Sequence, residues 1–442
     1  MITYSIIQKS QLEGAYRLDA EYYQPEYLDL LTQIKDFEIK NLKEISDILR
    51  GNTPKEYGDY DTPVIRSGDL SHEFINDEEN LLKAKKENVF FVQKNDILIS
   101  SIGFGSIGKV NIFTGQNNNF GTVAEVSVIR NPKLNPFYLW AFLKSKFGQF
   151  QINREITGAT GQLHLNTGNI ENILIPIINT QEFEYLYKEI EKYYQNSKSF
   201  YSQAENLLLE ELGLKDFKNE EDLFSIVNLS EVKNANRIDA EYFQPKYNRL
   251  FLQLKKYDAQ RLGELVTLKK GFEPGSEAYQ EEGKLFIRVS SLSKNGITDK
   301  DQKYLSDDLY KKLKKDYEPK VGEILLTKDA TPGIAYALKE PIEGIIAGGI
   351  LRLKLKEDIE PGYLTLCINS LVGQMQAERD AGGSIIAHWK PEQIKNLLIP
   401  ILSKPIQQKI AELVQKSHEA RSKAKQLLEQ AKSKVEGLIE SK

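Results

Sequence analysis

Two long stretches of the chain carry apolar residues at helical spacing and almost no helix breakers. The first runs from Thr180 to Leu214, has no proline, and reaches its first glycine at Gly213. The second begins at Pro405, a residue that suits a first helical turn. Apolar or small side chains recur at steps of three and four at Phe183, Leu186, Ile190, Tyr193, Ser197, Phe200, Ala204 and Leu207, and at Ile406, Ile410, Leu413, Ser417, Ala420, Ala424, Leu427, Ala431 and Leu438. This spacing predicts two long helices, each with a heptad seam.

Each predicted helix needs a partner for its apolar seam. Packing on its own domain is one solution. Each stretch has more than 30 residues, which is roughly 45 to 50 Å at 1.5 Å per residue and longer than a typical domain needs. The first stretch is acidic on balance and the second basic, so we expect them to pair with each other as an antiparallel spacer, with one domain at each end.

A second pattern is an internal repeat. The segment YSIIQKSQLEGAYRLDAEYYQPEY from Tyr4 returns as FSIVNLSEVKNANRIDAEYFQPKY from Phe224, at a constant offset of 220 residues. Such a period is far longer than the roughly 20 to 50 residues of a solenoid repeat, so each copy is long enough to be a domain. Two similar domains in one chain suit a ligand that is itself two-fold or bipartite.

The repeat continues with less fidelity. Matching pairs of positions are Arg50-Gly51 and Lys270-Gly271, Pro54 and Pro274, Ile65-Arg66 and Ile287-Arg288, Asn135-Pro136 and Glu360-Pro361, Gly148-Gln149 and Gly373-Gln374, and His164 and His388. Each copy ends in a strand-like run, ENILIPII from Glu171 and KNLLIPIL from Lys395. The middles, from Leu70 to Val126 and from Leu292 to Gly348, share little beyond apolar spacing. This indicates two related scaffolds that carry different recognition surfaces.

Composition narrows the class of protein. At 442 residues, 40% hydrophobic and 28% charged, the chain can build ordinary globular cores. The single cysteine, Cys367, excludes a disulfide framework and a cysteine-based zinc site, which favours a reducing cytoplasm. No signal-like start and no apolar run of about 18 residues is present in the sequence. The net charge of −4 argues only weakly against nucleic-acid binding, because local basic faces do the binding.

A glycine-rich run, DILISSIGFGSIGKV from Asp96, resembles a phosphate-binding loop. Gly103, Gly105 and Gly108 fit G-x-G-x-x-G, but Val110 stands where a P-loop needs Ser or Thr after Lys109. Both motifs also need a helix to begin at the glycines, whereas VNIFTGQNNN is typical of a strand and a turn. We therefore predict a tight turn between two strands, from which Lys109 can still face DNA.

Other catalytic motifs fail on similar grounds. NPFY at Asn135 lacks the second proline of the N-P-P-[FY] loop of amino-methyltransferases, and a helix start at Pro136 and at Pro361 fits better. His164 and His388 stand without a second metal ligand nearby, so a structural hydrogen bond or a DNA contact is expected rather than zinc. The pattern of Arg17 with Asp19, repeated in the second copy, fits a salt-bridged helix start better than acid–base chemistry. The sequence indicates no catalytic site.

These features together have a counterpart in a known family. The duplicated RLDAEYYQPEY and RIDAEYFQPKY, the GNTP and GFEP motifs, the strands after Asp96 and Gly322, the LIPI endings and the helix after each copy resemble the specificity subunit of type I restriction–modification systems, over essentially the whole chain. The resemblance implies an α+β fold with two pseudo-symmetric mixed α/β target-recognition domains, separated by two long antiparallel coiled-coil helices. The expected domains are residues 1–178 and 220–402, and the spacer helices are 179–219 and 403–442.

The resemblance also implies a function. Each recognition domain would read one half of a bipartite double-stranded DNA target, and the helices would dock two adenine-methyltransferase subunits, with restriction subunits joining the complex. The chain itself would be a non-catalytic cytoplasmic protein with no cofactor, since S-adenosylmethionine, ATP and magnesium belong to those partners. A solitary adenine methyltransferase and a coiled-coil scaffold with no role in DNA are the rival hypotheses. The DNA-contacting residues that we predict are Arg50, Arg66, Lys109, Arg154, His164, Lys270, Arg288, Lys328, Arg379 and His388.

Overall fold

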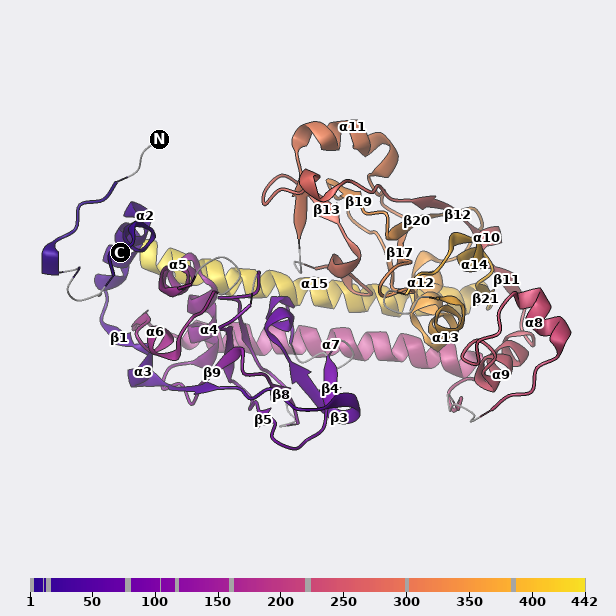
Figure 1. Cartoon of the computed structure of the whole chain (residues 1–442), viewed down its shortest axis with the longest axis horizontal. Helices are drawn as coiled ribbons and strands as arrows, with labels where there is room; N and C mark the ends of the chain where they lie inside the picture. The colour runs from indigo at the N-terminus through magenta and orange to yellow at the C-terminus, as the bar shows by residue number, and fades with distance from the viewer. Residues whose placement is uncertain are drawn as a thin grey trace. The chain divides into compact units, whose positions relative to one another are not determined.

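A computed structural model describes most of the chain (Figure 1). The described residues are 4–10, 12, 17–75, 81–103, 105–115, 119–158, 163–218, 224–298, 302–382 and 387–441. The chain divides into two compact units. The first comprises Met1–Tyr194 and Ser422–Lys442, and the second comprises Gln195–Arg421. Since both boundaries fall inside the long helices, each unit contains one part of each helix.

The two long helices are present. Helix α7 spans Gln181–Glu211 and helix α15 spans Lys404–Glu440. In the first unit the start of α7 and the end of α15 share one hydrophobic core, and Lys434 of α15 forms an ion pair with Glu182 of α7. In the second unit the remaining parts share another core, in which Ser417 Oγ donates a hydrogen bond to the carbonyl oxygen of Ser197 at 2.8 Å. Within each unit the helices therefore pack antiparallel, and the acidic and basic helices pair as predicted.

The predicted seams are correct in part. The buried positions that were predicted are Phe183, Leu186, Ile190, Ser197 and Ala204 on α7, and Ile410, Ser417, Ala420, Ala424, Leu427 and Ala431 on α15. The other positions are shifted. On α7 the predicted Tyr193, Phe200 and Leu207 are only half-buried. Their neighbours Tyr194, Tyr201 and Leu208 are the buried residues. On α15 the same shift of one residue exchanges Leu413 for Val414 and the exposed Leu438 for Ile439.

The shift has two physical causes. An α-helix turns once in about 3.6 residues, so its buried stripe drifts away from a strict repeat of 3.5. Each helix also packs on its own domain as well as on its partner helix. In the first unit the ring of Tyr194 stacks on Phe74 at 4.0 Å, and Phe183 meets Tyr138 edge-on at 5.4 Å. The buried stripe therefore follows the straight-helix period and serves both kinds of packing.

The first unit is built on two four-stranded sheets. In one, all neighbours are antiparallel in the order β2 (Asp47–Arg50), β9 (Val126–Arg130), β6 (Ile97–Ser100) and β7 (Val110–Ile112). The other has the order β4 (Leu82–Ala84), β3 (Tyr57–Ile65), β8 (Gly121–Thr122) and β5 (Phe90–Phe91), with β3 and β8 parallel. The first sheet matters for the site because β6, an apolar run buried along its whole length, ends beside β9.

Helices and a short ribbon complete the first unit. The helices are η1 (Ala20–Tyr23), α2 (Pro25–Lys35), α3 (Leu42–Ile45), η2 (Ser67–Ser71), α4 (Pro136–Lys144), α5 (Lys146–Glu155) and α6 (Thr167–Glu171). Strand β1 (Ile39–Asn41) pairs with β10 (Leu174–Pro176), so the predicted terminal strand closes the copy onto its own beginning.

The NPFY segment starts a helix, as predicted. The Asn135 side chain accepts hydrogen bonds from the backbone N–H groups of Phe137 at 2.9 Å and Tyr138 at 3.1 Å, and Pro136 occupies the first turn of α4. The phenol of Tyr138 donates to the carbonyl oxygen of Pro176 at 2.5 Å. In the second copy Tyr363 repeats this contact to Pro400 at 2.6 Å. These residues are structural.

The second unit repeats the first sheet with the same strand order. Its antiparallel strands are β12 (Val266–Lys270), β20 (Ile350–Leu355), β17 (Ile324–Thr327) and β18 (Ala335–Ala337). A three-stranded sheet follows the order β16 (Lys303–Leu305), β13 (Lys284–Ile287) and β19 (Gly344–Ile346), and β13 and β19 are parallel, like β3 and β8. Two ribbons pair β14 (Leu292–Ser293) with β15 (Gly296–Ile297) and β11 (Ala259–Arg261) with β21 (Leu398–Pro400).

The middle of the second unit differs from that of the first. Its helices are α8 (Leu229–Ala235), α9 (Pro245–Leu254), α10 (Leu262–Leu265), η4 (Ser276–Ala278), η5 (Val289–Ser291), α11 (Asp307–Tyr317), α12 (Pro361–Asn369), α13 (Leu371–Asp380) and α14 (Pro391–Lys395). Helix α11 lies over β19 (Figure 1), with Tyr310 buried against Phe286 and Ile345. The two scaffolds thus share a frame and differ where the sequence predicted different surfaces.

The glycine-rich run connects two strands, as predicted, but β6 ends at Ser100 and β7 begins at Val110, so the connection is longer than the predicted tight turn. Gly103, Gly105 and Gly108 all have positive φ, at 131°, 77° and 79°. Strand β7 begins at Val110 and pairs antiparallel with β6. A strand therefore follows the glycines where a phosphate-binding loop would have the N-terminus of a helix. In the part of the chain that the structure describes, no helix is both long enough and apolar enough to cross a membrane.

His418 of α15 should make the second unit sensitive to mild acid. Burial, together with the nearby positive charges of Lys339 and Arg421, lowers the pKa of this imidazole to about 4. In the unfolded chain this imidazole would accept a proton near pH 6.5. The contribution of neutral, buried His418 to the stability of the second unit is therefore fully present above that pH, and it is lost as the pH falls towards 4. At about 1.4 kcal/mol per pKa unit, the loss reaches about 3 kcal/mol.

Each unit contains one of the two tryptophans, Trp140 and Trp389, both buried. In a Trp140→Phe background, the fluorescence of Trp389 reports unfolding of the second unit. Between pH 7 and pH 5 the denaturation midpoint of the second unit should fall in the wild type, and we expect His418→Leu to remove most of this fall. His164→Leu, at an exposed site, should leave the fall unchanged. An identical decline in the His418→Leu protein would contradict the assignment.

Candidate nucleic-acid interface

A short turn at residues 123–125, between β8 and β9, gathers three distant segments of the first unit. Arg50 Nε, at the end of β2, donates to the carbonyl oxygen of Ala124 at 2.8 Å. The backbone N–H of Ser101, after β6, donates to the carbonyl oxygen of Glu125 at 2.8 Å. Ser67 Oγ, after β3, donates to that same oxygen at 3.4 Å. The ends of three strands therefore meet at turn 123–125.

The second unit has a related arrangement around turn 347–349, between β19 and β20. The backbone N–H of Lys328, after β17, donates to the carbonyl oxygen of Gly349 at 2.9 Å. The N–H of Ala347 donates to the carbonyl oxygen of Ile287, at the end of β13, at 2.8 Å. Lys328 follows β17 as Ser101 follows β6, so this backbone hydrogen bond to the turn is repeated in both units. The contact after β3 is made by Ser67 Oγ, so it uses different atoms from the contact at the end of β13.

A glycine at the end of the first strand is required in both units. Gly51 donates its N–H to the carbonyl oxygen of Val126 at 3.0 Å, and Gly271 donates to that of Ile350 at 3.1 Å. A Cβ atom on Gly51 would lie 2.1 Å from the carbonyl oxygen of Val123, and one on Gly271 would lie 2.2 Å from that of Ala347. The backbones approach too closely for any side chain, which explains why both copies keep glycine.

Three of the predicted contact residues of the first unit lie around turn 123–125. Arg50 is exposed, and the side chain of Arg66 is 42% exposed, with Nε 3.3 Å from the buried carboxylate of Asp69. His164 is exposed, and its backbone pairs with Thr157 and bridges to Ile102, the residue after Ser101. Two arginines and a histidine thus surround one turn and leave polar atoms open to solvent.

Lys109 lies close to this group, on the neighbouring turn. Its side chain is exposed, and its carbonyl oxygen accepts a hydrogen bond from the N–H of Ser100 at 2.9 Å. Lys109 precedes β7, whereas Lys328 follows β17, so the two lysines are not equivalent. The counterpart of Lys328 is Ser101, which makes the same backbone contact to its turn.

Four predicted contact residues lie near turn 347–349 in the second unit, and each interacts with a neighbouring side chain. Lys270 is 57% exposed and lies 3.9 Å from Glu273. The guanidinium of Arg288 lies 5.8 Å from the centre of the Tyr279 ring. Lys328 and His388 both bind the carboxylate of Asp329, and His388 Nδ1 is 2.8 Å from Oδ1.

The Asp329 carboxylate changes what Lys328 can do. Burial alone would raise the pKa of Asp329, but hydrogen bonds from Lys328 and His388 outweigh it and hold the pKa below its usual range. The carboxylate is therefore ionised and offsets much of the charge of Lys328, whose side chain is only 12% exposed. Lys270, Arg288 and His388, which is 61% exposed, remain the more accessible groups.

Arg154 and Arg379 contact residues of the duplicated segments that begin at Tyr4 and Phe224. Arg154 Nε donates to the carbonyl oxygen of Tyr22 at 2.9 Å, and its guanidinium lies 3.7 Å from the centre of the Tyr22 ring. Arg379 lies 4.8 Å from the ring of Tyr242 and 4.4 Å from that of Phe251. These cation–π contacts account for an arginine at both positions without DNA.

The two turns and their acidic and hydroxyl neighbours were not predicted from the sequence. Thr53 Oγ1 accepts a hydrogen bond from the N–H of Ala124 at 3.1 Å and lies 3.3 Å from Glu125 Oε2. In the second unit the acidic neighbour is Asp329, which follows Lys328 in the chain rather than lying in the turn. Both turns lie in the middles of the copies, where the repeat is weakest, so only the paired glycines Gly51 and Gly271 pointed towards them.

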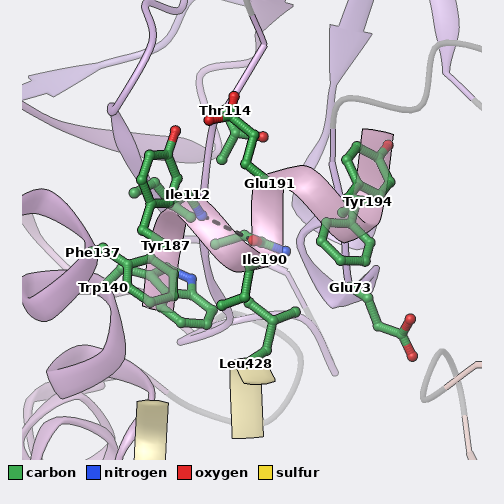
Figure 2. Close-up of a pocket in the computed structure, with 12 residues that line it drawn as sticks. Glu73, Ile112, Thr114, Phe137, Trp140, Tyr187, Ile190, Glu191, Tyr194 and Leu428 are labelled. Carbon is green, nitrogen blue, oxygen red and sulfur yellow. Dashed lines mark hydrogen bonds between the residues drawn. The ribbon is translucent and has the colours of Figure 1, made fainter. Parts of the chain in front are cut away.

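A cavity of about 20 Å³ lies elsewhere in the first unit. Figure 2 shows Tyr187 of α7 beside Phe137 and Trp140 of α4, with Leu428 of α15 completing the wall. The indole nitrogen of Trp140 and the phenol of Tyr187 are buried without a hydrogen-bond partner. This space admits about one water molecule, which both groups could bind, whereas cofactor sites measure roughly 300 Å³ or more.

The described residues contain no group of three or more His, Cys, Asp or Glu side chains that could hold a metal ion. The clusters at the two turns combine basic side chains, histidine and a few carboxylates. Such a set can bind phosphates and the edges of bases through hydrogen bonds and charge. The geometry thus fits recognition of a nucleic acid in each unit.

The chain is similar to known proteins over most of its length. The type I restriction modification DNA specificity domain matches residues 34–198 and 255–432. The specificity subunit of the type I restriction enzyme MjaIX from Methanocaldococcus jannaschii is 25% identical over 408 residues, which cover 86% of each chain. Among solved structures, the S subunit of a type I restriction-modification system from M. genitalium is 14% identical with a TM-score of 0.36, covering 91% of this chain and 95% of that one. The HsdS subunit from Thermoanaerobacter tengcongensis is 12% identical with a TM-score of 0.29, covering 91% and 96%.

The family model matches two separate blocks, one in each copy of the repeat, and together they span most of the chain. This is the arrangement that the duplicated sheets and turns predict. The chain belongs to the family of type I restriction-modification DNA specificity domains.

Proposed function

We propose that this chain is the DNA-specificity subunit of a type I restriction–modification complex and that each unit reads one half of a bipartite target. The observation that carries the proposal is the pair of equivalent turns, 123–125 and 347–349, each surrounded by basic side chains on an otherwise different surface. A repeated frame with different surroundings suits two readers of unlike sequences.

The candidate residues divide by the chemistry of their side chains. Arginine can donate two parallel hydrogen bonds to the O6 and N7 atoms of guanine, so Arg50, Arg66 and Arg288 are proposed as base-reading groups. Lysines such as Lys109 and Lys270 offer a single mobile charge that suits phosphate and positions the duplex. His164 and His388 occupy equivalent places at the edge of each turn and are proposed as further contacts.

Methylation and cleavage are assigned to partner subunits. We propose that α7 and α15 dock two adenine-methyltransferase subunits, that restriction subunits join this assembly, and that the complex acts in the cytoplasm. The chain itself would be non-catalytic and would hold no cofactor. The proposed recognition domains are residues 1–178 and 220–402, with spacer helices at 179–219 and 403–442.

Alanine at Arg66 or Arg288 should weaken binding of one half-site only. Loss of a bidentate contact to a base costs about 1 to 3 kcal/mol, and it relaxes preference at that base pair alone. The measurement is competition binding of the chain with its methyltransferase subunit to duplexes that vary in one half-site. Arg261→Ala, at an exposed arginine on β11, is the matched control.

Two other outcomes would change the assignment. A uniform loss for all duplexes, with a salt dependence reduced by about one phosphate contact, would make the residue a backbone contact. Unchanged affinity for every duplex in both variants would remove Arg66 and Arg288 from the interface.

A further inference from the structure

Large apolar side chains are exposed at the same three positions in both copies of the repeat. Tyr4, Ile6 and Leu18 are 78%, 90% and 85% exposed. Their counterparts 220 residues later, Phe224, Ile226 and Ile238, are 79%, 94% and 87% exposed. We call the two sets the first strip and the second strip. A scattered exposed apolar residue is ordinary, but a repeated set indicates a surface that another molecule covers.

The outward position of the first two residues follows from an alternation along the chain. Ser5 and Ile7 are half-buried between exposed neighbours, and Ser225 and Val227 repeat this pattern. Such alternation is typical of an extended segment that lies on a surface with every second side chain pointing away. In the first unit Ser5 Oγ donates to the carbonyl oxygen of Tyr23 at 2.5 Å, which fixes the segment to the unit.

The third residue of each strip is turned outward by the residues beside it. Arg17 and Asp19 flank Leu18 and bind each other at 2.5 Å, and Arg17 lies 4.8 Å from the centre of the Tyr22 ring. In the second copy Arg237 and Asp239 do the same around Ile238, at 2.5 Å. Because both neighbours are committed to this pair, the apolar residue between them faces solvent in each unit.

The segments lack the internal support that most structured chain has. Among the described residues, no backbone hydrogen bond joins 4–7 or 224–227 to the rest of the protein. In the second unit the segment continues into α8, none of whose residues is buried. Extended chain with unpaired backbone groups and outward apolar side chains is ready to bind another polypeptide.

We propose that the first and second strips are two equivalent docking sites for an apolar surface on one kind of partner protein, which binds in two copies. The chemistry of each position is kept between copies, as Tyr or Phe, Ile, and Leu or Ile. The same surface on the partner therefore fits either strip. The proposal rests on the proposed function, in which the protein present twice is the methyltransferase subunit, and it adds a docking site outside α7 and α15.

Stoichiometry tests the proposal directly. Native mass spectrometry of the chain with its methyltransferase subunit should show two copies bound to the wild type. Ile6→Ser with Leu18→Ser should leave one copy bound, as should Ile226→Ser with Ile238→Ser, each with at least a tenfold loss of affinity at the altered strip. The four-fold variant should bind none at concentrations that saturate the wild type.

Matched controls come from exposed apolar residues without an apolar counterpart. Leu252 is 63% exposed and corresponds to Thr32, and Leu82 of β4 is 47% exposed. Leu252→Ser and Leu82→Ser should leave two copies bound. Unchanged unfolding reported by Trp140 and Trp389 would show that the strip variants keep their fold.

Three results would overturn the proposal and can be told apart. Two copies still bound by the four-fold variant would show that the strips are not docking sites, and the proposed function would stand. Self-association of the chain that the strip variants abolish would assign the strips to a second copy of this chain. If the wild-type chain does not bind a methyltransferase subunit, whether or not it binds DNA, both the strip assignment and the proposed complex would be overturned.

Discussion

Replacing residues 1–178 with the equivalent part of a relative that reads another target should change one half of the DNA target and leave the other half intact. All the segments that meet at turn 123–125 lie within this range, and so do both sheets of the first unit. Each base pair of the old half-site that no longer matches should cost about 1 to 3 kcal/mol. Methylation mapped on a library of targets would report both halves at once.

The exchange needs a donor whose contact faces fit the helices that remain. Tyr138 must still meet Phe183 of α7, at 5.4 Å in this chain, and Glu73 binds Lys425 of α15 at 2.7 Å. Exchange of residues 220–402 is the reciprocal control and should change only the other half. A hybrid whose whole target changed, or which still methylated the old sequence, would contradict one reader per unit.

Valine at Gly51 or Gly271 should disable one reader and spare the other. Each side chain would collide with a backbone carbonyl oxygen, 2.1 Å away in the first unit and 2.2 Å in the second, so the turn must move. Overpacking of this kind costs about 1 to 3 kcal/mol. Since the basic groups are positioned by that turn, preference at one half-site should be lost together with part of that unit's stability.

Each unit has its own reporter and its own control for this experiment. Trp140 follows unfolding of the first unit in a Trp389→Phe background, and Trp389 follows the second in the converse background. Gly168→Ala and Gly382→Ala place a methyl group in open space and should change neither stability nor target. Equal losses in both units from a single valine, or an unaltered target in both variants, would show that the turns do not organise the readers.

The frame of the fold could be predicted because its signals are local and repeated. Long periodic stretches predicted α7 and α15, and Asn135 with Pro136 predicted the start of α4 from the needs of a helix terminus. The buried stripe on α7 was misplaced by one residue at Tyr194, Tyr201 and Leu208. Sequence spacing alone does not show that a helix packs on two partners at once.

The candidate site was predictable in part. Gly51 and Gly271 stood out because both copies kept them, and the structure explains this by the close approach of two backbones. The turns that they approach were not predictable, because hydrogen bonds to a backbone carbonyl leave no mark on residue type. Basic residues were also ambiguous. Arg154 has the side chain expected of a DNA contact, and in the structure its guanidinium packs on the ring of Tyr22.

The central claim is that one chain reads two separate half-sites. The most direct measurement is selection from a fully randomised duplex library by the wild-type chain bound to its methyltransferase subunit, followed by sequencing of the retained DNA. We predict two short fixed sequences, different from each other and separated by a run of unspecified bases of constant length. A single continuous motif, two identical half-sites, or retention with no preferred sequence would contradict the account.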